Sequence, residues 1–475
     1  MPRSRTSSGG ELLVELDRDD SAPLHRQLEQ ELRTAIRSGR IEHETALPSS
    51  RALAEQLGLS RGVIVEAYEQ LVAEGYLSST PGGATRVAAS VTATPKSAEP
   101  ADGTLPDLLP ATDAAINFAP GRPDVTQFPR QAWLKSLRRV LNEAPSERLT
   151  YLDLRGTPEV RQALASYLNR VRGTSADPDA IVICNGFAQA LRLVAQVVRE
   201  SGGRRIAAED PGFAEAAAAA GDHGLELVPI PVDGDGLDVG ALARVDADAV
   251  LVTPAHQFPT GAVLSAERRA ALVAWAKERN ALILEDDYDA EYRYDREPIG
   301  AIHGLAPERV IYTGSASKTL APGLRLGWML VPPRLVEPIA RTKEHVDRGS
   351  PSLEQLAFAD FLERGEFDQH LRRMRPMYRR RRDVLLEALR RELPEVQPVG
   401  ASAGLHVLAW LPPGADEAAI VRRARDEGVG ISGLASYGST RAGGPGALDF
   451  GYGSVGEAQI VEGVRIVAAA MHAVG

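Results

Sequence analysis

The chain contains a single cysteine, Cys184, among its 475 residues. One thiol can form neither an intrachain disulfide nor a cysteine cluster for a metal ion, so both are excluded, and we expect no metal site. Cys184 ends the apolar run 181–184, which favours a place in the core. These features are typical of a protein from a reducing compartment, and we expect the cytoplasm.

Long apolar runs and an excess of positive charge are also lacking. No run of 18 apolar residues occurs, and residues 1–16 lack the apolar segment of a secretory signal. We therefore expect neither a membrane segment nor export. The formal net charge of −10 argues against a protein that coats nucleic acid, but it is compatible with a small DNA-reading module.

The length predicts two or three domains, and the pattern from about residue 115 onward predicts an α/β domain. Strands alternate with helical patterns there, which indicates a mostly parallel sheet with helices on both faces. Strands are expected at 181–184, 205–208, 249–253, 281–285, 310–313 and 326–331, and helices at 187–200, 264–279 and 335–347.

A basic stretch at 372–391 precedes a smaller α/β unit. We expect it to form a helix that is kinked or restarted at Pro376. Its arginine run, 379–382, could be a nucleic-acid patch, but a solvated helix face is the more favoured interpretation.

The stretch 310–328 suits a phosphorylated aldehyde cofactor. A β-branched run leads through small polar residues to Lys318, and Arg325 follows. A lysine amine can form a Schiff base with the aldehyde, while Ser315 and Arg325 hold the phosphate. The alternative is a solvated loop lysine, which is the commoner state of a lysine taken alone.

A second stretch favours the cofactor. The apolar run 281–284 ends in Glu285, Asp286, Asp287 and Tyr288. Ligands of open α/β sheets bind at the carboxyl ends of the strands. A carboxylate there can pair with the protonated pyridine nitrogen of pyridoxal phosphate.

The pattern S-x-S-K…G-x-R-x-G and the E-D-D-Y strand end resemble the fold-type-I aminotransferase family, in the family's order and approximate spacing. The resemblance implies pyridoxal phosphate, with Lys318 as Schiff-base lysine, Asp286 at the pyridine nitrogen and Tyr288 at the phenolic oxygen. It also implies that the phosphate contacts Ser315, Arg325 and the turn 185–189, which contains Phe187 and Ala188. The ring would contact Phe213, and Tyr151 would reach the site of the partner subunit. For Phe213 or Tyr151 taken alone, core packing is an equal alternative.

Two positions depart from the family's pattern. Where aminotransferases carry an asparagine before Pro-Thr-Gly, this chain has Phe258, which cannot hydrogen-bond the phenolic oxygen. The alternatives are that His256 takes its place, that Gln257 does, or that nothing does. Where the family has an arginine for the substrate carboxylate, this chain has Asp449, which would repel that group. Arg441 lies in a nearby glycine-rich loop and has no assigned place.

Residues 21–88 predict a small helical unit with a β-hairpin. Leucines and an isoleucine at four-residue intervals mark a first helix that ends near Ser38, and Gly58 separates a helix at 51–57 from one at 61–74. Short strands at 76–78 and 85–88 flank a Pro-Gly-Gly turn. Two helices joined by a glycine turn indicate either a helix-turn-helix or an ordinary helical corner.

A resemblance favours the DNA-binding interpretation. The segments LPSSR (47–51), LGLSR (57–61), AYEQL (67–71) and EGYL (74–77) resemble the winged helix of the GntR family. The resemblance implies that Arg51, Ser60, Arg61 and the wing glycines Gly82 and Gly83 lie against DNA, with Arg61 at a phosphate or a guanine edge.

The whole layout is similar to that of the MocR subfamily of GntR regulators. The expected parts are an extension (1–20), the winged helix-turn-helix (21–88), a linker (89–114) and the cofactor-binding domain (115–475). The resemblance implies a homodimer whose binding to double-stranded promoter DNA responds to pyridoxal phosphate and to an amine or amino-acid effector. Such regulators control vitamin B6 or amine metabolism.

Asp449 favours a sensor of pyridoxal phosphate itself, as in the PdxR group. One alternative is an active aminotransferase with an appended DNA-binding domain. Another is a dead cofactor site that serves only as a dimerisation scaffold, which the joint presence of Lys318, Asp286, Tyr288 and Arg325 disfavours.

Overall fold

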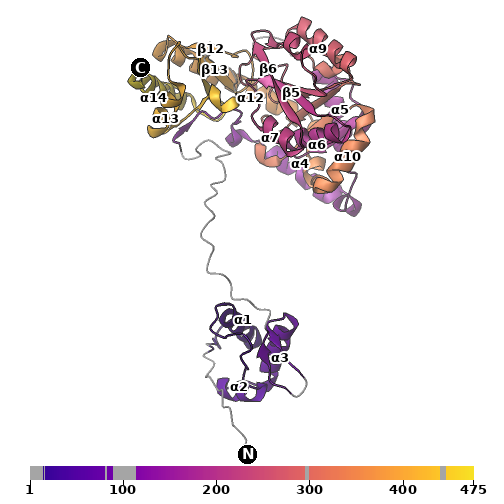
Figure 1. The fold of residues 1–475 in the computed structure, drawn as a ribbon, viewed down its shortest axis with the longest axis vertical. Helices are drawn as coiled ribbons and strands as arrows, with labels where there is room; N and C mark the ends of the chain where they lie inside the picture. The colour runs from indigo at the N-terminus through magenta and orange to yellow at the C-terminus, as the bar shows by residue number, and fades with distance from the viewer. Residues whose placement is uncertain are drawn as a thin grey trace, which may run out of the picture. The chain divides into compact units, whose positions relative to one another are not determined.

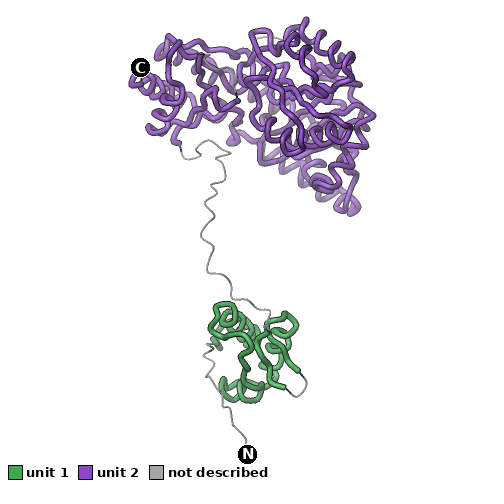
Figure 2. Tube along the Cα trace, in the orientation of Figure 1, with its two compact units in different colours: residues 1–107 green, residues 108–475 purple. Residues whose placement is uncertain are grey.

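The computed structural model describes residue 14 and residues 16–80, 83–88, 114–294, 299–438 and 445–474. The chain divides into two compact units, 1–107 and 108–475 (Figure 2). The division falls within the expected linker, which lies outside the described residues except for Ala114. Each unit is therefore taken by itself.

The first unit is a winged helix, as predicted. It contains α1 (Leu24–Arg37), α2 (Ser50–Leu57), α3 (Arg61–Ala73), β1 (Leu77–Ser78) and β2 (Arg86–Val87), with the two strands antiparallel (Figure 1). Leu28, Leu32 and Ile36 lie one turn apart on α1 and are buried in a common core. The hydroxyl of Ser49 accepts a hydrogen bond from the Ala52 amide and so starts α2, and Gly58 ends α2 in the left-handed conformation, with a φ of 63°.

Part of the expected extension belongs to this unit. Val14 and Leu16 pack against its core. The Arg18 guanidinium donates to the Gly58 carbonyl at 3.2 Å, which ties the segment to the turn between α2 and α3.

The second unit is built on an eight-stranded sheet in the order β4-β11-β10-β9-β8-β5-β6-β7. The strands β6, β5, β8, β9 and β10 are successively parallel, whereas β11 runs antiparallel to both of its neighbours. The bounds are β4 (Ile181–Cys184), β5 (Arg205–Asp210), β6 (Glu226–Asp233), β7 (Gly236–Leu237), β8 (Ala249–Val252), β9 (Leu282–Asp286), β10 (Val310–Ser315) and β11 (Gly327–Leu330).

Both faces of this sheet are covered by helices, so its strands read as continuous apolar runs. On β9, Leu282 and Leu284 pack with α6 (Phe187–Glu200), α7 (Glu215–Asp222) and α10 (Pro333–Asp347). Ile283 points to the other face, toward α8 (Val239–Ala243) and α9 (Ala266–Arg279). Figure 1 shows α6, α7 and α10 grouped beside the sheet.

A smaller unit follows, as expected, with a four-stranded antiparallel sheet in the order β12-β13-β16-β15. A parallel pair, β3 with β14, joins the start of this half of the chain to its end. The remaining strands are β3 (Ile116–Asn117), β12 (Gln397–Val399), β13 (His406–Trp410), β14 (Val429–Gly430), β15 (Ser432–Gly433) and β16 (Ala447–Gly451). The remaining helices are α4 (Arg130–Glu143), α5 (Pro158–Arg172), α11 (Ser352–Glu363), α12 (Glu366–Glu392), α13 (Glu417–Asp426) and α14 (Glu457–Val474).

Six short 3-10 helices complete the described elements: η1 (Val125–Gln127), η2 (Ser146–Leu149), η3 (Pro178–Ala180), η4 (Ile302–Leu305), η5 (Pro322–Leu324) and η6 (Leu434–Tyr437). Among the residues that the structure describes, no helix combines the length and the apolar character needed to cross a membrane.

The basic helix differs from expectation in two respects. The helix α12 does not restart at Pro376, because buried residues on both sides of it, among them Met374 and Tyr378, are held by tertiary packing. The arginine run is solvated only in its first half. Arg381 pairs with Asp124 at 2.7 Å, and Arg382 is buried, so these two arginines hold the fold together.

Candidate functional site

Five strand ends bring most of the predicted cofactor residues to one edge of the large sheet. The strands β4, β5, β8, β9 and β10 share one direction, so their carboxyl ends meet there. The loops that follow these strands carry the turn 185–189, Phe213, His256, Tyr288 and Lys318. Sequence-distant residues thereby form one candidate site.

Lys318 and Asp286 form the electrostatic centre of this site. Burial lowers the pKa of the Lys318 amine, although the carboxylates of Asp286 and Asp289 act in the opposite direction. Burial, together with the charge of Asp287, raises the pKa of Asp286 well above its usual range, while the Thr313 hydroxyl donates to it at 3.2 Å. A lysine that loses its proton readily is a good nucleophile, and a buried carboxylate is stabilised by a cationic partner.

Gly121 makes room for the lysine. Its φ is +68°, and a Cβ at this position would lie 2.7 Å from the Lys318 Nζ. The approach of this backbone leaves space for the amine but none for a side chain. Sequence reasoning missed this residue, whose glycine-proline surroundings indicate a turn but not its neighbour in space.

The start of α6 forms an anion site with Arg325. Gly186 lies at the N-cap with a φ of 89°, and no side chain caps the helix, so its first amides point outward beside Phe187 and Ala188. The Arg325 guanidinium donates to the Asn185 carbonyl. A Cβ on Gly186 would lie 3.0 Å from a nitrogen of this guanidinium. Ser315, half-buried, ends β10. These groups suit a phosphate.

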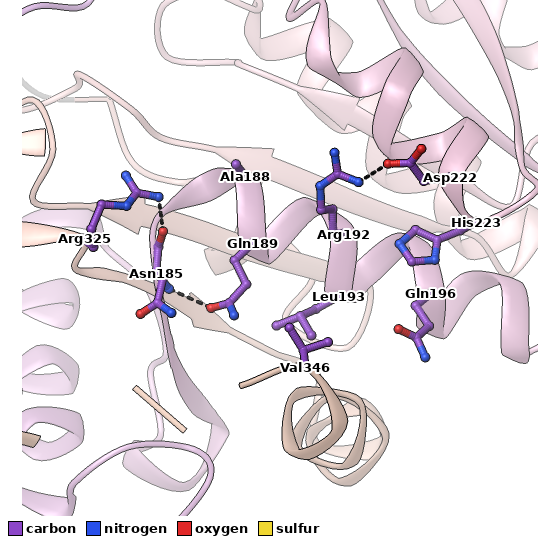
Figure 3. A pocket seen from close by; sticks show the side chains of 10 residues that line it. All are labelled: Asn185, Ala188, Gln189, Arg192, Leu193, Gln196, Asp222, His223, Arg325 and Val346. Carbon is purple, nitrogen blue, oxygen red and sulfur yellow. Dashed lines mark hydrogen bonds and ion pairs between the residues drawn. The ribbon is translucent and has the colours of Figure 1, made fainter. Parts of the chain in front are cut away.

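The turn itself is held by α10. The backbone N–H of Asn185 donates to the side-chain oxygen of Gln189 at 2.7 Å, and the Gln189 side chain donates to Asp347 at 2.6 Å. An open cavity of about 410 Å³ runs along α6 from Arg325 and Asn185, past Val346, to the Arg192–Asp222 ion pair and His223 (Figure 3). The candidate phosphate site therefore opens onto this cavity.

Aromatic residues cluster at the candidate site. Phe187 and Phe213 meet edge to face, with ring centroids 5.3 Å apart. Phe258 contacts Tyr437 and Tyr288, with centroid distances of 5.0 and 6.0 Å. Phe258 is thus an apolar wall next to the tyrosine that is expected to meet the phenolic oxygen.

Of the two candidates to replace the missing asparagine, His256 is the one that contacts Tyr288. Its Nδ1 lies 3.0 Å from the Tyr288 hydroxyl and 2.9 Å from the Asp289 carboxylate. Gln257 turns elsewhere, because its amide nitrogen donates to the Pro211 carbonyl at 2.9 Å and its oxygen accepts from the Thr260 hydroxyl at 2.6 Å.

Asp449 is buried on β16 beside this group. Its Oδ2 accepts a hydrogen bond from the Tyr437 hydroxyl at 2.8 Å. Burial raises its pKa to about 8, opposed by the Tyr437 hydrogen bond and by His256. Burial thus favours the uncharged acid near neutral pH, which weakens the expected charge repulsion.

The sequence reasoning missed a buried neighbour of His256. His406, on β13, has its ring centroid 5.2 Å from that of His256. His256, Asp289 and His406 offer ligand atoms within 4.8 Å of one another. The two nitrogens of His256 are used in hydrogen bonds to Asp289, Tyr288 and the Gly400 carbonyl, so we interpret the group as a hydrogen-bonded network.

Tyr151 is the predicted residue that this chain does not bring into the site. Its side chain is 83% exposed, and Leu149 nearby is 61% exposed. Arg441 lies outside the described residues.

In the winged helix, Arg61 opens α3 and Arg51 lies on α2, and both are exposed. The Arg61 Nε donates to the Ser50 hydroxyl at 3.4 Å. Ser60 occupies the N-cap of α3 but makes no side-chain cap. Gly83 is exposed, and Gly82 lies outside the described residues.

Known protein families match both units of the chain. The family model for class I and II aminotransferases matches residues 114–446, and that for bacterial regulatory proteins of the gntR family matches residues 24–87. The chain is 34% identical over 444 residues to the probable rhizopine catabolism regulatory protein MocR of Rhizobium meliloti, covering 89% of this chain and 88% of that protein. The chain belongs to the MocR subfamily of GntR-family transcription regulators.

Other MocR-type regulators align over similar lengths. The pyridoxine biosynthesis regulator PdxR of Corynebacterium glutamicum is 31% identical, covering 94% of this chain and 95% of that protein. The HTH-type regulator YhdI of Bacillus subtilis is 38% identical, covering 87% and 88%.

Solved aminotransferases share the fold of the second unit of this MocR-type regulator. A multiple substrate aminotransferase from Thermococcus profundus matches with a TM-score of 0.70 and 29% identity, over 76% of this chain and 92% of that one. The α-aminoadipate aminotransferase LysN of Thermus thermophilus, complexed with N-(5'-phosphopyridoxyl)-L-leucine, matches with a TM-score of 0.68 and 28% identity, over 76% and 92%.

Proposed function

We propose that this MocR-type regulator binds pyridoxal phosphate at the carboxyl edge of its large sheet, and that occupancy of this site changes its binding to a promoter operator. The observation that supports it is the pairing of a half-buried lysine with a buried carboxyl, Lys318 with Asp286, beside a glycine that clears space at the amine. A structural lysine would need no such clearance.

The residues of the chain divide the binding tasks. Lys318 is the Schiff-base lysine, Asp286 holds the proton of the ring nitrogen, and Tyr288 donates to the phenolic oxygen. Phosphate is held by Ser315, Arg325 and the first amides of α6. Phe213 packs against the ring. Bound pyridoxal phosphate would supply an aldehyde and an electron-withdrawing ring.

Tyr151 supports a homodimer. An almost fully exposed tyrosine next to exposed Leu149 is costly in water, and a second copy would cover both. Under this proposal Tyr151 enters the site of the partner subunit, and two winged helices are presented to DNA together. Each would contact DNA through Arg51, Ser60, Arg61, Gly82 and Gly83.

The effector is proposed to be pyridoxal phosphate itself, alone or with an amine, in the control of vitamin B6 or amine metabolism. Asp449 supports this choice. A bidentate arginine fixes a carboxylate, whereas an aspartic acid hydrogen-bonded to Tyr437 offers no positive charge for it. Common α-amino acids should then bind weakly and turn over poorly.

Cofactor capture is tested by visible absorbance. The purified protein should absorb in the visible range on addition of pyridoxal phosphate, and Lys318→Ala should show only the spectrum of the free cofactor. Lys277→Ala, which removes an exposed lysine, is the matched control and should behave as the wild type. A wild-type protein that never colours would refute the proposal.

A second candidate function, an aminotransferase with a DNA-binding unit, is favoured by the match to solved aminotransferases and by the joint presence of Lys318, Asp286 and Tyr288. Incubation with a panel of amino acids and a keto-acid acceptor separates the two functions. Sustained keto-acid formation supports the enzyme, and its absence supports the regulator.

A further inference from the structure

The environment of His256 fixes which of its nitrogens carry protons. The Nε2 atom lies 3.0 Å from the Gly400 carbonyl, which can only accept, so Nε2 is protonated. The Nδ1 atom lies 2.9 Å from the Asp289 carboxylate and 3.0 Å from the Tyr288 hydroxyl. A proton on Nδ1 as well would be donated to the Asp289 carboxyl group and would make the ring a cation.

The backbone of two glycines packs closely against the His256 ring. A Cβ on Gly404 would lie 2.7 Å from Nδ1 of His256, and a Cβ on Gly261 would lie 2.8 Å from Nε2. The hydroxyls of Tyr294 and Tyr452 both donate to the Gly404 carbonyl at 2.7 Å, which holds this backbone segment in place. His256 is buried, so its partners are fixed by the protein and not by water.

The surrounding charges favour a cation at His256 and not at its neighbour. Burial alone would lower the pKa of His256, but the charge and hydrogen bond of Asp289 and the Gly400 carbonyl outweigh it and raise the pKa. Burial, and then the charge of His256, lower the pKa of His406 to about 4. The titratable groups around His256 are Tyr288 and Asp289 after β9, Arg293, His406 on β13 and Asp449 on β16.

A cation at this point decides the direction of the Tyr288 hydrogen bond. A neutral ring with a bare Nδ1 would accept the Tyr288 proton. An imidazolium whose Nδ1 proton faces Asp289 does not accept that hydrogen bond, so the Tyr288 hydroxyl remains a donor, to the Asp289 carboxylate or to a ligand in the site. Asp289 also helps to raise the pKa of Tyr288, after burial, so this proton is not lost.

We propose that His256 is an imidazolium, held between Asp289 and the Gly400 carbonyl, and that it positions the Tyr288 hydroxyl as a donor to the phenolic oxygen of the cofactor. His256 and Asp289 are then positioning residues that do the work of the amide missing at Phe258. The inference rests on the proposed function for its ligand, but the charge on His256 is a property of the protein alone.

The first arm of the test therefore uses cofactor-free protein, comparing His256→Gln with His406→Gln. A raised histidine pKa contributes stability that is present below the unfolded value near 6.5 and lost as pH rises through the folded value. His256→Gln should thus be more destabilising at pH 6 than at pH 9. His406 has a lowered pKa, so His406→Gln should gain stability relative to wild type as pH falls below 6.5. Equal pH profiles for the two variants would overturn the proposal.

The second arm follows the visible absorbance of cofactor-loaded protein against pH. His256→Gln removes a cation and a hydrogen-bond donor near the phenolic oxygen. The pH midpoint of the absorbance change should therefore rise by about one unit in this variant. Asp289→Asn should move it in the same direction, the double variant should add little, and His406→Gln should leave it unchanged. A midpoint unaffected by His256→Gln refutes the positioning role.

Added zinc supplies a third readout. If Zn²⁺ stabilises the cofactor-free wild type but not His406→Gln, the three side chains are metal ligands and the proposal fails. If the first arm succeeds and no cofactor binds, the charge assignment stands and the proposed function fails instead.

Discussion

Replacing Asp449 by asparagine should flatten the pH dependence of stability in the aminotransferase-like domain. Asp449 is buried, one oxygen accepts from Tyr437, and the other has no hydrogen-bond partner among the residues that the structure describes. Burial raises the pKa to about 8. Asparagine keeps an acceptor for Tyr437 and cannot ionise.

The magnitude follows from proton linkage. At pH 7 a group with a pKa of about 8 is roughly nine-tenths protonated when folded and almost fully ionised when unfolded, because the unfolded pKa is about 3.9. A raised pKa contributes stability that is present below the unfolded value and lost as pH rises through the folded value. The slope is about 1.4 kcal/mol per pH unit, so this group alone costs wild type about 3 kcal/mol between pH 5 and pH 7.

Urea unfolding at pH 5, 6, 7 and 8 measures this slope. All four tryptophans lie beyond residue 114, so their fluorescence reports on the aminotransferase-like domain. Wild type and Asp449→Asn should diverge steadily with pH, in favour of the variant. Asp426→Asn, an exposed change of the same kind at the end of α13, should track wild type. Parallel curves for wild type and Asp449→Asn would refute the reasoning.

Three further predictions follow from the sites. Arg61→Ala should weaken operator binding roughly tenfold or more at a fixed salt concentration, because a base or phosphate contact contributes on the order of 1–3 kcal/mol, and equal affinities would contradict the placement of α3. Gly121→Ala should weaken cofactor binding in an absorbance titration, because the new Cβ would displace the Lys318 amine, and an unchanged dissociation constant would contradict the close approach. Tyr151→Ala and Lys318→Ala should each lose normal cofactor absorbance, yet a mixed dimer should regain one complete site, and no recovery on mixing would contradict the contribution of Tyr151 across subunits.

The sequence predicted those elements whose physics is local. The strand expected at 281–285 is observed as Leu282–Asp286, because a strand buried on both faces must be apolar throughout. The helix expected at 187–200 has those bounds in the structure. Two-residue strands such as Gly236–Leu237 have no periodicity from which to be predicted.

Long-range contacts explain what the sequence could not predict. Pro376 reads as a helix break, but packing along α12 overrides its local cost. Arg381 reads as a surface charge, and only the fold brings it to Asp124.

The same division holds at the site. Lys318 and Asp286 could be named because strand-end motifs identify them, whereas Gly121 and His406 enter from distant segments with no local signal. The charge of Asp449 depends on burial, which the sequence does not reveal.

The most direct test of the central proposal is promoter binding with and without cofactor. Wild type and Lys318→Ala are titrated against the promoter fragment of the protein's own gene region at one stated salt concentration. The account predicts that pyridoxal phosphate changes the affinity of wild type and leaves that of Lys318→Ala unaltered. Identical wild-type binding curves with and without pyridoxal phosphate, in a protein that visibly binds it, would contradict the account.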